Sequence, residues 1–276
     1  MFRASQHQGH DYIMDLLEQL SNWHFYLLGS FPRGDIGGLL LNIILALLAI
    51  LSSFIFGALL GYSRLSCRPY VKYPCVAYIE TVRSTPLIMI IFWFYFFLPY
   101  LFGGAITIFW SAVISLSVYA SAYEAEIVRA GIIAVPKGQL EAALSTGMSR
   151  YKAMRHVVLP QAFRIMVPSF VSFFVSLFKD TSVCYIIGIV ELTQAGIIIS
   201  QRQPDRMYAA YLCMGIGFWL VCFSMSLVAR KLEKRIGVFD LESIRPEACR
   251  DDYMLFPARK QDADPEMLSA CQTQER

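Results

Sequence analysis

Charged residues are scarce in this chain and are absent from long stretches of it. Of the 276 residues, 16% are charged and 56% are apolar, whereas soluble domains carry about 25% charged residues. No Asp, Glu, Lys or Arg occurs in residues 36–63, 84–123 or 207–229. A bilayer core about 30 Å thick is crossed by a helix of about 20 apolar residues. The composition therefore argues against an ordinary soluble domain and predicts an all-α, polytopic membrane protein.

Metal-ligand and disulfide patterns are also lacking. None of the seven cysteines forms a CxxC pair, and His156 is the one histidine beyond residue 24. Zinc sites and disulfide frameworks need clustered or regularly spaced cysteines and histidines. We therefore expect no metal, no cofactor and no disulfide, with the cysteines serving as small apolar residues.

Five spans are predicted from the apolar runs. The run 84–123 is about twice the length of one span and contains Pro99 and Gly103-Gly104, which break a helix and form a turn. It therefore predicts two spans. A shorter charge-free run, residues 165–178, predicts a further span when it is extended on both sides. The expected spans are 37–62, 84–101, 105–128, 162–180 and 207–230, and residues 181–190 are expected to form a short re-entrant or partly buried helix.

Basic residues cluster on one side of this topology. They lie in the first loop, in the loop between the third and fourth spans, and after the last span: Arg64, Arg68, Lys72, Arg83, Arg129, Lys137, Arg150, Lys152, Arg155, Arg164, Arg230, Lys231, Lys234 and Arg235. The 99–104 turn has no charge, and segment 181–206 has two arginines offset by two acids. Because cytoplasmic loops carry the excess of Lys and Arg, we expect the N-terminus outside and the C-terminus in the cytoplasm.

The two ends fall outside the spans. Residues 1–35 have no apolar core ending in a cleavage site, so no signal peptide is predicted, and either Met1 or Met14 can be the start. We expect this segment to be periplasmic or interfacial and residues 36–236 to form one membrane domain. The polar residues 237–276 are expected to form a disordered cytoplasmic tail.

A compact motif, Glu141-Ala142-Ala143-Leu144-Ser145-Thr146-Gly147, lies in the second basic loop. Ala142 and Ala143 allow a partner to approach closely, and Glu141 near the helix start can meet a basic group. Gly147 can supply a left-handed turn that ends the helix. A helix this short is stable only when something packs on it. We therefore expect it to dock on another protein, the alternative being an ordinary amphipathic pair of interfacial helices.

The residues that flank this motif also predict helix boundaries. Pro136 suits the first position of a helix because its missing N–H costs nothing there. Ser149 can cap a second, basic helix over residues 150–156. This second helix is expected to stop at Pro160.

Several ordered stretches resemble the permease subunits of polar amino-acid ABC importers. They are Arg83-Ser84-Thr85-Pro86-Leu87, the segment 123–132, Pro136-Lys137-Gly138-Gln139 leading into Glu141-Ala142-Ala143, the segment 159–164, and Lys179-Asp180-Thr181-Ser182. The spacing EAA-x3-G-x9-hydrophobic-x-LP matches the loop by which such permeases engage their ATPase. The resemblance covers roughly residues 35–235.

The resemblance implies a type I ABC importer permease fold with five spans in a bacterial cytoplasmic (inner) membrane. It implies pairing with a like or similar permease, a cytosolic ATPase dimer docked on Glu141, Ala142, Ala143 and Gly147, and an amino-acid-binding protein outside. It implies no nucleic-acid partner. The chain has no GxxxxGK[ST] phosphate loop, so the ATPase must be a separate subunit.

Four residues are candidates for substrate binding. Lys179 and Asp180 lie at the outer end of the fourth span, where ionisable groups are costly and face an aqueous cavity or each other, and they suit the two charges of an amino acid. The resemblance adds Thr181 and Glu124. For Lys179 and Asp180 the alternatives are a self-paired Lys–Asp or a snorkelling lysine. For Glu124 and Glu126 the alternative is that they only mark the cytoplasmic end of the third span, since Glu126 can pair with Arg129.

The sequence alone does not identify the substrate, and two other function classes have to be compared with the permease. Segments 93–95 and 179–183 look most like permeases of acidic amino acids, which favours glutamate or aspartate over arginine or histidine. An ion-coupled secondary transporter is the alternative function, although such proteins are often built from two inverted repeats and no second half resembles the first. A membrane enzyme would need convergent catalytic groups at membrane depth, and none occurs.

Overall fold

The computed structural model describes residues 23–29, 36–66, 68–104 and 106–236. The expectations for the start of the chain, for most of segment 1–35 and for the tail 237–276 fall outside these residues. Within the described ranges the regular structure is helical, and the only β pairing there is two isolated bridges, Gly29 with Ile36 and Gly38 with Glu191. The all-α fold class is therefore confirmed.

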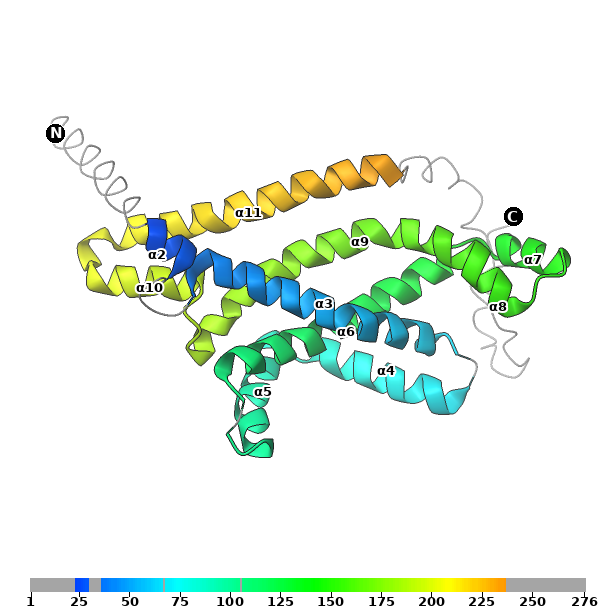
Figure 1. Ribbon diagram of the computed structural model, residues 1–276, viewed down its shortest axis with the longest axis horizontal. Helices are drawn as coiled ribbons and strands as arrows, with labels where there is room; N and C mark the ends of the chain where they lie inside the picture. Colours follow the sequence, from blue (N-terminus) through cyan, green and yellow to red (C-terminus); the bar gives the residue numbers. More distant parts are fainter. Residues whose placement is uncertain (1–22, 30–35, 67, 105, 237–276) are drawn as a thin grey trace, which may run out of the picture.

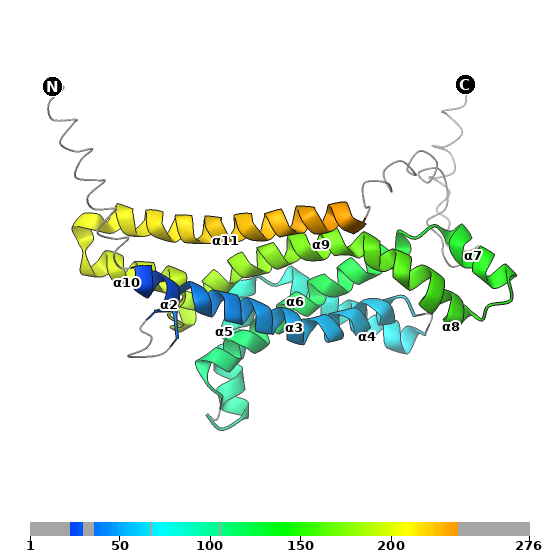
Figure 2. The ribbon, with the colours of Figure 1, turned by 45° about the horizontal axis from the view of Figure 1, so that its top comes forward.

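Four long helices run along the long axis of the molecule (Figure 1). They are α3 (Gly38–Arg64), α6 (Ile108–Ile133), α9 (Leu159–Asp180) and α11 (Met207–Ile236). The short helices α7 (Lys137–Ser145) and α8 (Arg150–Ala153) lie at one end, and α2 (Trp23–Leu28) and α10 (Leu192–Arg202) lie at the other (Figures 1 and 2). The basic 137–155 loop and the nearly neutral 181–206 segment are thus at opposite ends, as the charge pattern requires.

Three described helices are long and apolar enough to cross a bilayer: α3, the continuous helical stretch Arg150–Ile187 that contains α9, and α11. A fourth span arises if the bent pair α4 (Pro69–Ser84) and α5 (Leu87–Leu101) is taken as one. The remaining expected span, 105–128, corresponds to α6, whose serines, tyrosines and acidic residues lower its hydropathy. The count of five therefore stays a prediction.

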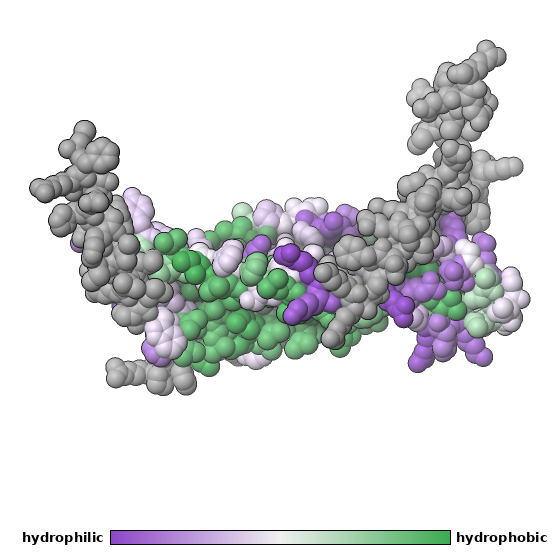
Figure 3. Space-filling model, turned by 90° about the horizontal axis from the view of Figure 1, so that it is seen from above, coloured by the Kyte–Doolittle hydropathy of each residue, from purple (hydrophilic) through white to green (hydrophobic). Residues whose placement is uncertain are grey.

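The surface between the two ends is mostly apolar. Figure 3 shows hydrophobic residues over the middle of the molecule and hydrophilic ones around the end that carries α7 and α8. On α11, the exposed side chains include Leu212, Trp219 and Phe223. A surface of this kind is stable against lipid rather than water, which agrees with a multi-pass membrane protein.

The first basic loop is a helix, which the sequence analysis did not predict. Residues 69–84 form α4, and α5 follows at an angle of 107° after a short break. Pro69 occupies the first turn, where a proline is tolerated. The helix ends because Thr85 precedes Pro86 and adopts an extended conformation (φ −96°, ψ 131°). The prolines and charges of this segment are typical of a loop in a sequence. In the structure, Pro69 begins a helix and Pro86 follows its end.

The expectation that Pro160 stops the second basic helix is wrong. After α8, residues Met154–Val158 form a π-helical turn, η1, and the chain continues directly into α9. In this turn the Leu159 N–H bonds to the Met154 carbonyl, five residues back, so the register has shifted before the proline. Pro160 then sits in the first turn of α9, where its lack of an N–H is tolerated.

Helices α3 and α6 approach closely because α3 has glycines at their contact. A Cβ added at Gly57 would lie 2.8 Å from the Glu124 Cβ, and one at Gly61 would lie 2.8 Å from the Val128 Cβ. Real Cβ atoms do not come this close, so only glycine fits at these two positions. Small residues at a helix contact are a common means of packing in membranes, where lipid gives no hydrophobic drive for helix association.

Candidate functional site

The motif at residues 141–147 forms the second half of α7 and the turn that follows, as the sequence predicted. Its residues face different ways: Ala143 is buried against the rest of the chain, while Glu141 and Ala142 are exposed. Pro136 precedes the helix as its N-cap rather than occupying its first position. Leu140 packs with Val135 and Val158 in a cluster that joins α6, α7 and η1. One face of α7 is therefore packed against the chain, and the other is exposed.

Gly147 ends α7 in a Schellman motif. Its φ is +83°, its N–H bonds to the Leu144 carbonyl at 3.0 Å, and the Met148 N–H bonds to the Ala143 carbonyl at 3.3 Å. This pair of bonds satisfies carbonyls that would otherwise lack partners at a helix end. No atom lies within 4 Å of a Cβ placed at Gly147, so the glycine is needed for its backbone conformation and not for space within the chain.

Apolar side chains surround this turn. Leu144, Met148 and Tyr151 are exposed, although they lie at the hydrophilic end of the molecule. Ser149 caps α8, with its hydroxyl accepting from the Lys152 N–H at 3.5 Å, as expected. The exposed face of α7 and the following turn thus offer an apolar contact surface set among basic residues.

At the opposite end of α9, Lys179 and Asp180 differ in burial. Lys179 is exposed, whereas Asp180 is half-buried and interacts electrostatically with both Lys179 and Tyr119 of α6. Consecutive residues of an α-helix project about 100° apart, which explains why one is exposed and the other half-buried. No ion pair between the two is found among the described residues.

Thr181 belongs to a buried network that the sequence analysis missed. Its hydroxyl donates to the Phe178 carbonyl at 2.7 Å and accepts from the Asn42 amide at 2.9 Å. The same amide nitrogen lies 2.9 Å from Glu191 Oε2, and the Asn42 oxygen accepts from the Leu192 N–H at 3.0 Å. All of the side chains in this network are buried, so in this conformation Thr181 is engaged within the protein.

Glu191 is the N-cap of α10. Its carboxylate accepts from the Thr193 and Gln194 N–H groups at 2.9 and 3.0 Å. Glu191 lies outside the expected spans; burial raises the pKa of its carboxyl, and the hydrogen bonds lower that pKa in part. One sequence signal could have found this cap: an acidic residue at the start of a helix, where a negative charge is favoured by the helix dipole. Its pairing with Asn42 across 149 positions left no local signal.

Glu124 lies on the α3 side of α6 and not beside Lys179 and Asp180. It is fully buried, with Gly57 and Ser53 of α3 next to it. Among the described residues its carboxylate oxygens have no hydrogen bond of good geometry. The structure therefore divides the four candidate residues by burial: Lys179 is exposed, Asp180 is half-buried, and Thr181 and Glu124 are buried in the helix packing.

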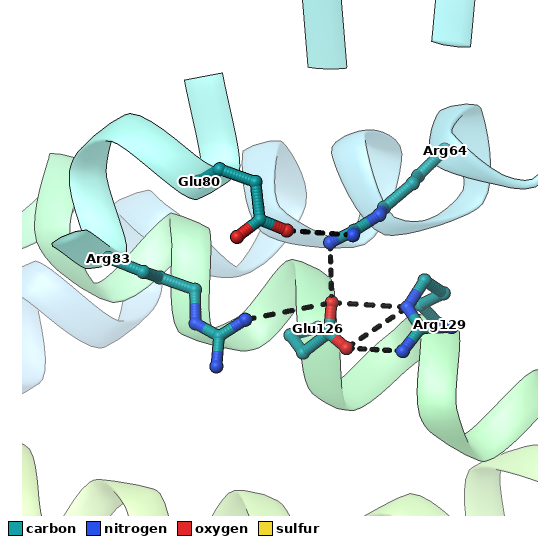
Figure 4. Close-up of polar contacts among 5 residues, drawn as sticks. All are labelled: Arg64, Glu80, Arg83, Glu126 and Arg129. Carbon is teal, nitrogen blue, oxygen red and sulfur yellow. Dashed lines mark hydrogen bonds and ion pairs between the residues drawn. The ribbon is translucent and has the colours of Figure 1, made fainter. Parts of the chain in front are cut away.

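An arginine cluster surrounds Glu126 at the end of α6 nearest α7 (Figure 4). Arg64 Nη1 lies 2.7 Å from Glu126 Oε2, and its other terminal nitrogen lies 2.8 Å from Glu80 Oε1. Arg129 donates to the same Glu126 carboxylate, as its helical spacing predicted. Arg83 Nη1 is 4.0 Å away. The cluster ties α3, α4 and α6 together.

The chain matches the family described as "Binding-protein-dependent transport system inner membrane component" over residues 53–238. A probable glutamine ABC transporter permease protein of Bacillus subtilis is 38% identical over 72% of this chain and 91% of its own length. An L-cystine transport system permease protein of the same organism is 34% identical over 72% of this chain and 85% of its own length. A glutamate/aspartate import permease protein of Escherichia coli is 31% identical over 72% of this chain and 91% of its own length.

Solved structures agree with these relatives. A crystal structure of an amino acid ABC transporter with histidines superposes with a TM-score of 0.67 at 32% identity, covering 72% of this chain and 92% of the other. An inward-facing methionine ABC transporter, at 20% identity and a TM-score of 0.55, shares the fold. The match covers 70% of this chain and 91% of the methionine transporter chain. The chain therefore belongs to the family of binding-protein-dependent transport system inner membrane components, as an ABC importer permease subunit and not an enzyme.

Proposed function

We propose that this chain is the membrane-spanning permease of an importer that moves polar amino acids across a bacterial cytoplasmic (inner) membrane. The observation that carries the proposal is the exposed docking helix α7 with its Schellman turn, placed at the opposite end of the molecule from Asp180. An ATPase bound at one end could then control access to a cargo site at the other. The family match and the amino-acid permeases among the relatives support this reading.

The proposal includes three partners. A cytosolic ATPase dimer docks on Glu141, Ala142 and the turn at Gly147, with Ala143 holding α7 against the permease. A second permease, identical or paralogous, completes the pathway. An amino-acid-binding protein delivers cargo outside, at the end formed by α2 and α10. This orientation puts the N-terminus outside and the C-terminus inside, with residues 36–236 as the membrane domain.

The cargo is a molecule that carries both an ammonium and a carboxylate. Asp180 offers a carboxylate for the ammonium, and Lys179 offers a counter-charge for an acid. The narrower preference for glutamate or aspartate is one choice within this class, since the relatives include glutamine and cystine permeases as well as a glutamate/aspartate permease. Glutamine, glutamate, aspartate and cystine are therefore the first substrates to test.

Reconstitution tests the proposal against the ion-coupled alternative. The permease would be co-purified with the ATPase and binding protein encoded beside it and placed in proteoliposomes. Uptake of the amino acid should require ATP and the binding protein and should be indifferent to H⁺ and Na⁺ gradients. Uptake by the permease alone, driven by either gradient, would contradict the proposal and favour a secondary transporter.

A further inference from the structure

A row of half-buried polar groups runs along one face of α6. Tyr119, Tyr123 and Glu126 are each partly exposed, whereas Ser121, Ala122, Glu124 and Ala125 between them are buried. The spacing of four and three residues puts the first three on one face of the helix. The ring centroids of Tyr119 and Tyr123 are 4.7 Å apart. This row, named here the α6 polar stripe, links the Asp180 end of the molecule to the arginine cluster.

Arg83 lies at the inner end of the α6 polar stripe. Its guanidinium carbon is 5.5 Å from the centre of the Tyr123 ring, within the range of a cation–π contact. On the other side its Nη1 faces Glu126 (Figure 4). Arg83 comes from the last turn of α4, immediately before the 107° bend into α5. It therefore lies where the break between α4 and α5 meets the α6 polar stripe.

Arg83 is the least engaged of the three arginines around Glu126. Arg64 and Arg129 both donate hydrogen bonds to that carboxylate, whereas Arg83 lies 4.0 Å from it, beyond hydrogen-bond distance. Its side chain is 36% exposed, compared with 17% for Arg64 and 31% for Arg129. Among the described residues, the ion pairs of this cluster join three arginines and two glutamates, so these five side chains together carry one net positive charge. A guanidinium with free N–H donors binds a carboxylate through two parallel hydrogen bonds.

We propose that Arg83 binds the α-carboxylate of the amino-acid cargo at the cytoplasmic end of its path, an inference that rests on the proposed function. Tyr123 holds the guanidinium from one side, and Glu126 prevents it from leaving the stripe. The rise of a helix between residues 119 and 126 is about 10 Å. This is longer than the distance between the two charges of one amino acid. Asp180 and Arg83 therefore act in succession, the first on the ammonium and the second on the carboxylate.

Binding of two matched ligands tests the role of Arg83. The complex of permease and ATPase would be placed in nanodiscs without ATP, and saturation binding of L-glutamine would be compared with that of its α-amide, which lacks the carboxylate. If the wild type imports glutamate, aspartate, arginine or histidine faster, that amino acid and its α-amide serve instead. Arg83→Gln should weaken binding of the acid roughly tenfold to a hundredfold, as for a hydrogen bond to a charged group. Its affinity for the amide should be unchanged.

Two variants separate cargo binding from a structural role. Arg83→Lys keeps the charge without the planar fork and should fall between the wild type and Arg83→Gln. Lys72→Gln removes a charge from the exposed surface of the same helix and should change neither affinity. Equal losses for acid and amide in Arg83→Gln, or no loss for the acid, would overturn the inference.

Two further controls test whether Arg83 binds a lipid headgroup and whether the proposed function itself fails. The measurement would be repeated in nanodiscs of phosphatidylcholine alone and with added phosphatidylglycerol. An effect of Arg83→Gln that appears only with the anionic lipid would assign Arg83 to a headgroup and overturn the cargo role. A wild-type complex that imports amino acids but shows no saturable binding would also overturn it. Failure of the wild type to import any of these amino acids would instead contradict the proposed function.

Discussion

At the scale of single residues, chemistry that looks like one site in the sequence is divided by the helix geometry. Lys179 and Asp180 are neighbours in the chain, yet Lys179 is exposed and Asp180 is half-buried, while Thr181 and Glu124 are buried in the helix packing. The side chains of Lys179 and Asp180 can still meet one substrate at this end of α9. The sequence could predict the residue types but not their burial, because burial depends on which neighbours pack around α9.

The first prediction concerns these two side chains. Lys179→Ala and Asp180→Ala should each raise the half-saturating concentration for uptake roughly tenfold to a hundredfold, since each removes a charge-assisted contact. If both groups bind the same amino acid, the double variant should lose less than the sum of the two free energies. The measurement is uptake kinetics at matched membrane levels. Wild-type kinetics in the double variant would show that the pair only neutralises itself.

A second prediction at this scale concerns Glu191. Glu191→Ala removes the N-cap of α10 and leaves the buried Asn42 amide without one partner, and a buried donor left without a partner costs about 1–3 kcal/mol. The thermal unfolding temperature of the purified protein should therefore fall. Glu191→Gln keeps one acceptor oxygen and should fall less. Gln194→Ala is the control, because the carboxylate accepts from the Gln194 backbone N–H, which this variant keeps. An unchanged unfolding temperature in Glu191→Ala would contradict the role of the network.

At the scale of elements, the motif that the sequence predicted best is α7. Its helix, the left-handed turn at Gly147 and the cap at Ser149 all depend on local backbone chemistry and were therefore visible in the sequence. The helix α4 was not predicted, and the expectation that Pro160 ends a helix was wrong. Prolines are ambiguous in a sequence because they can begin a helix as well as end one. The choice depends on the register of the preceding turn, which here is a π turn.

The third prediction tests α7 as a docking element. Gly147→Asp adds a charge to the turn, while Gly147→Asn tolerates the same left-handed backbone without a charge. A side chain at this position meets nothing within 4 Å in the chain itself. Loss of ATPase binding and uptake in Gly147→Asp should therefore arise from the partner, and Gly147→Asn should retain most of both. Normal uptake by Gly147→Asp at an unchanged membrane level would remove the docking role.

At the scale of the whole molecule, charge and shape agree on one arrangement. The basic, hydrophilic end carries α7 and α8, the middle is apolar, and the far end carries the buried Asn42–Glu191 network (Figures 1 and 3). The sequence predicted this polarity from its loops. It could not predict that α2 and α10 pack together around Tyr26 and Leu192, because that contact joins segments far apart in the chain.

The fourth prediction concerns the orientation of this arrangement. In a variant without native cysteines, a single cysteine at Gly103 or Gln203 should react with a membrane-impermeant maleimide added outside intact cells. A single cysteine at Lys137 or Arg150 should react only after the membrane is opened. The physical reason is the excess of Lys and Arg on the cytoplasmic side. The reverse labelling pattern would place α7 where no cytosolic ATPase can reach it.

The central claim is that a separate ATPase drives this permease in response to cargo delivered outside. The most direct measurement is ATP hydrolysis by the reconstituted complex, with the binding protein on the outer side either empty or loaded with its amino acid. We predict that the loaded binding protein raises hydrolysis and uptake together, and that Gly147→Asp abolishes this stimulation. Uptake that continues without ATP hydrolysis, or hydrolysis that never responds to the loaded binding protein, would contradict the account.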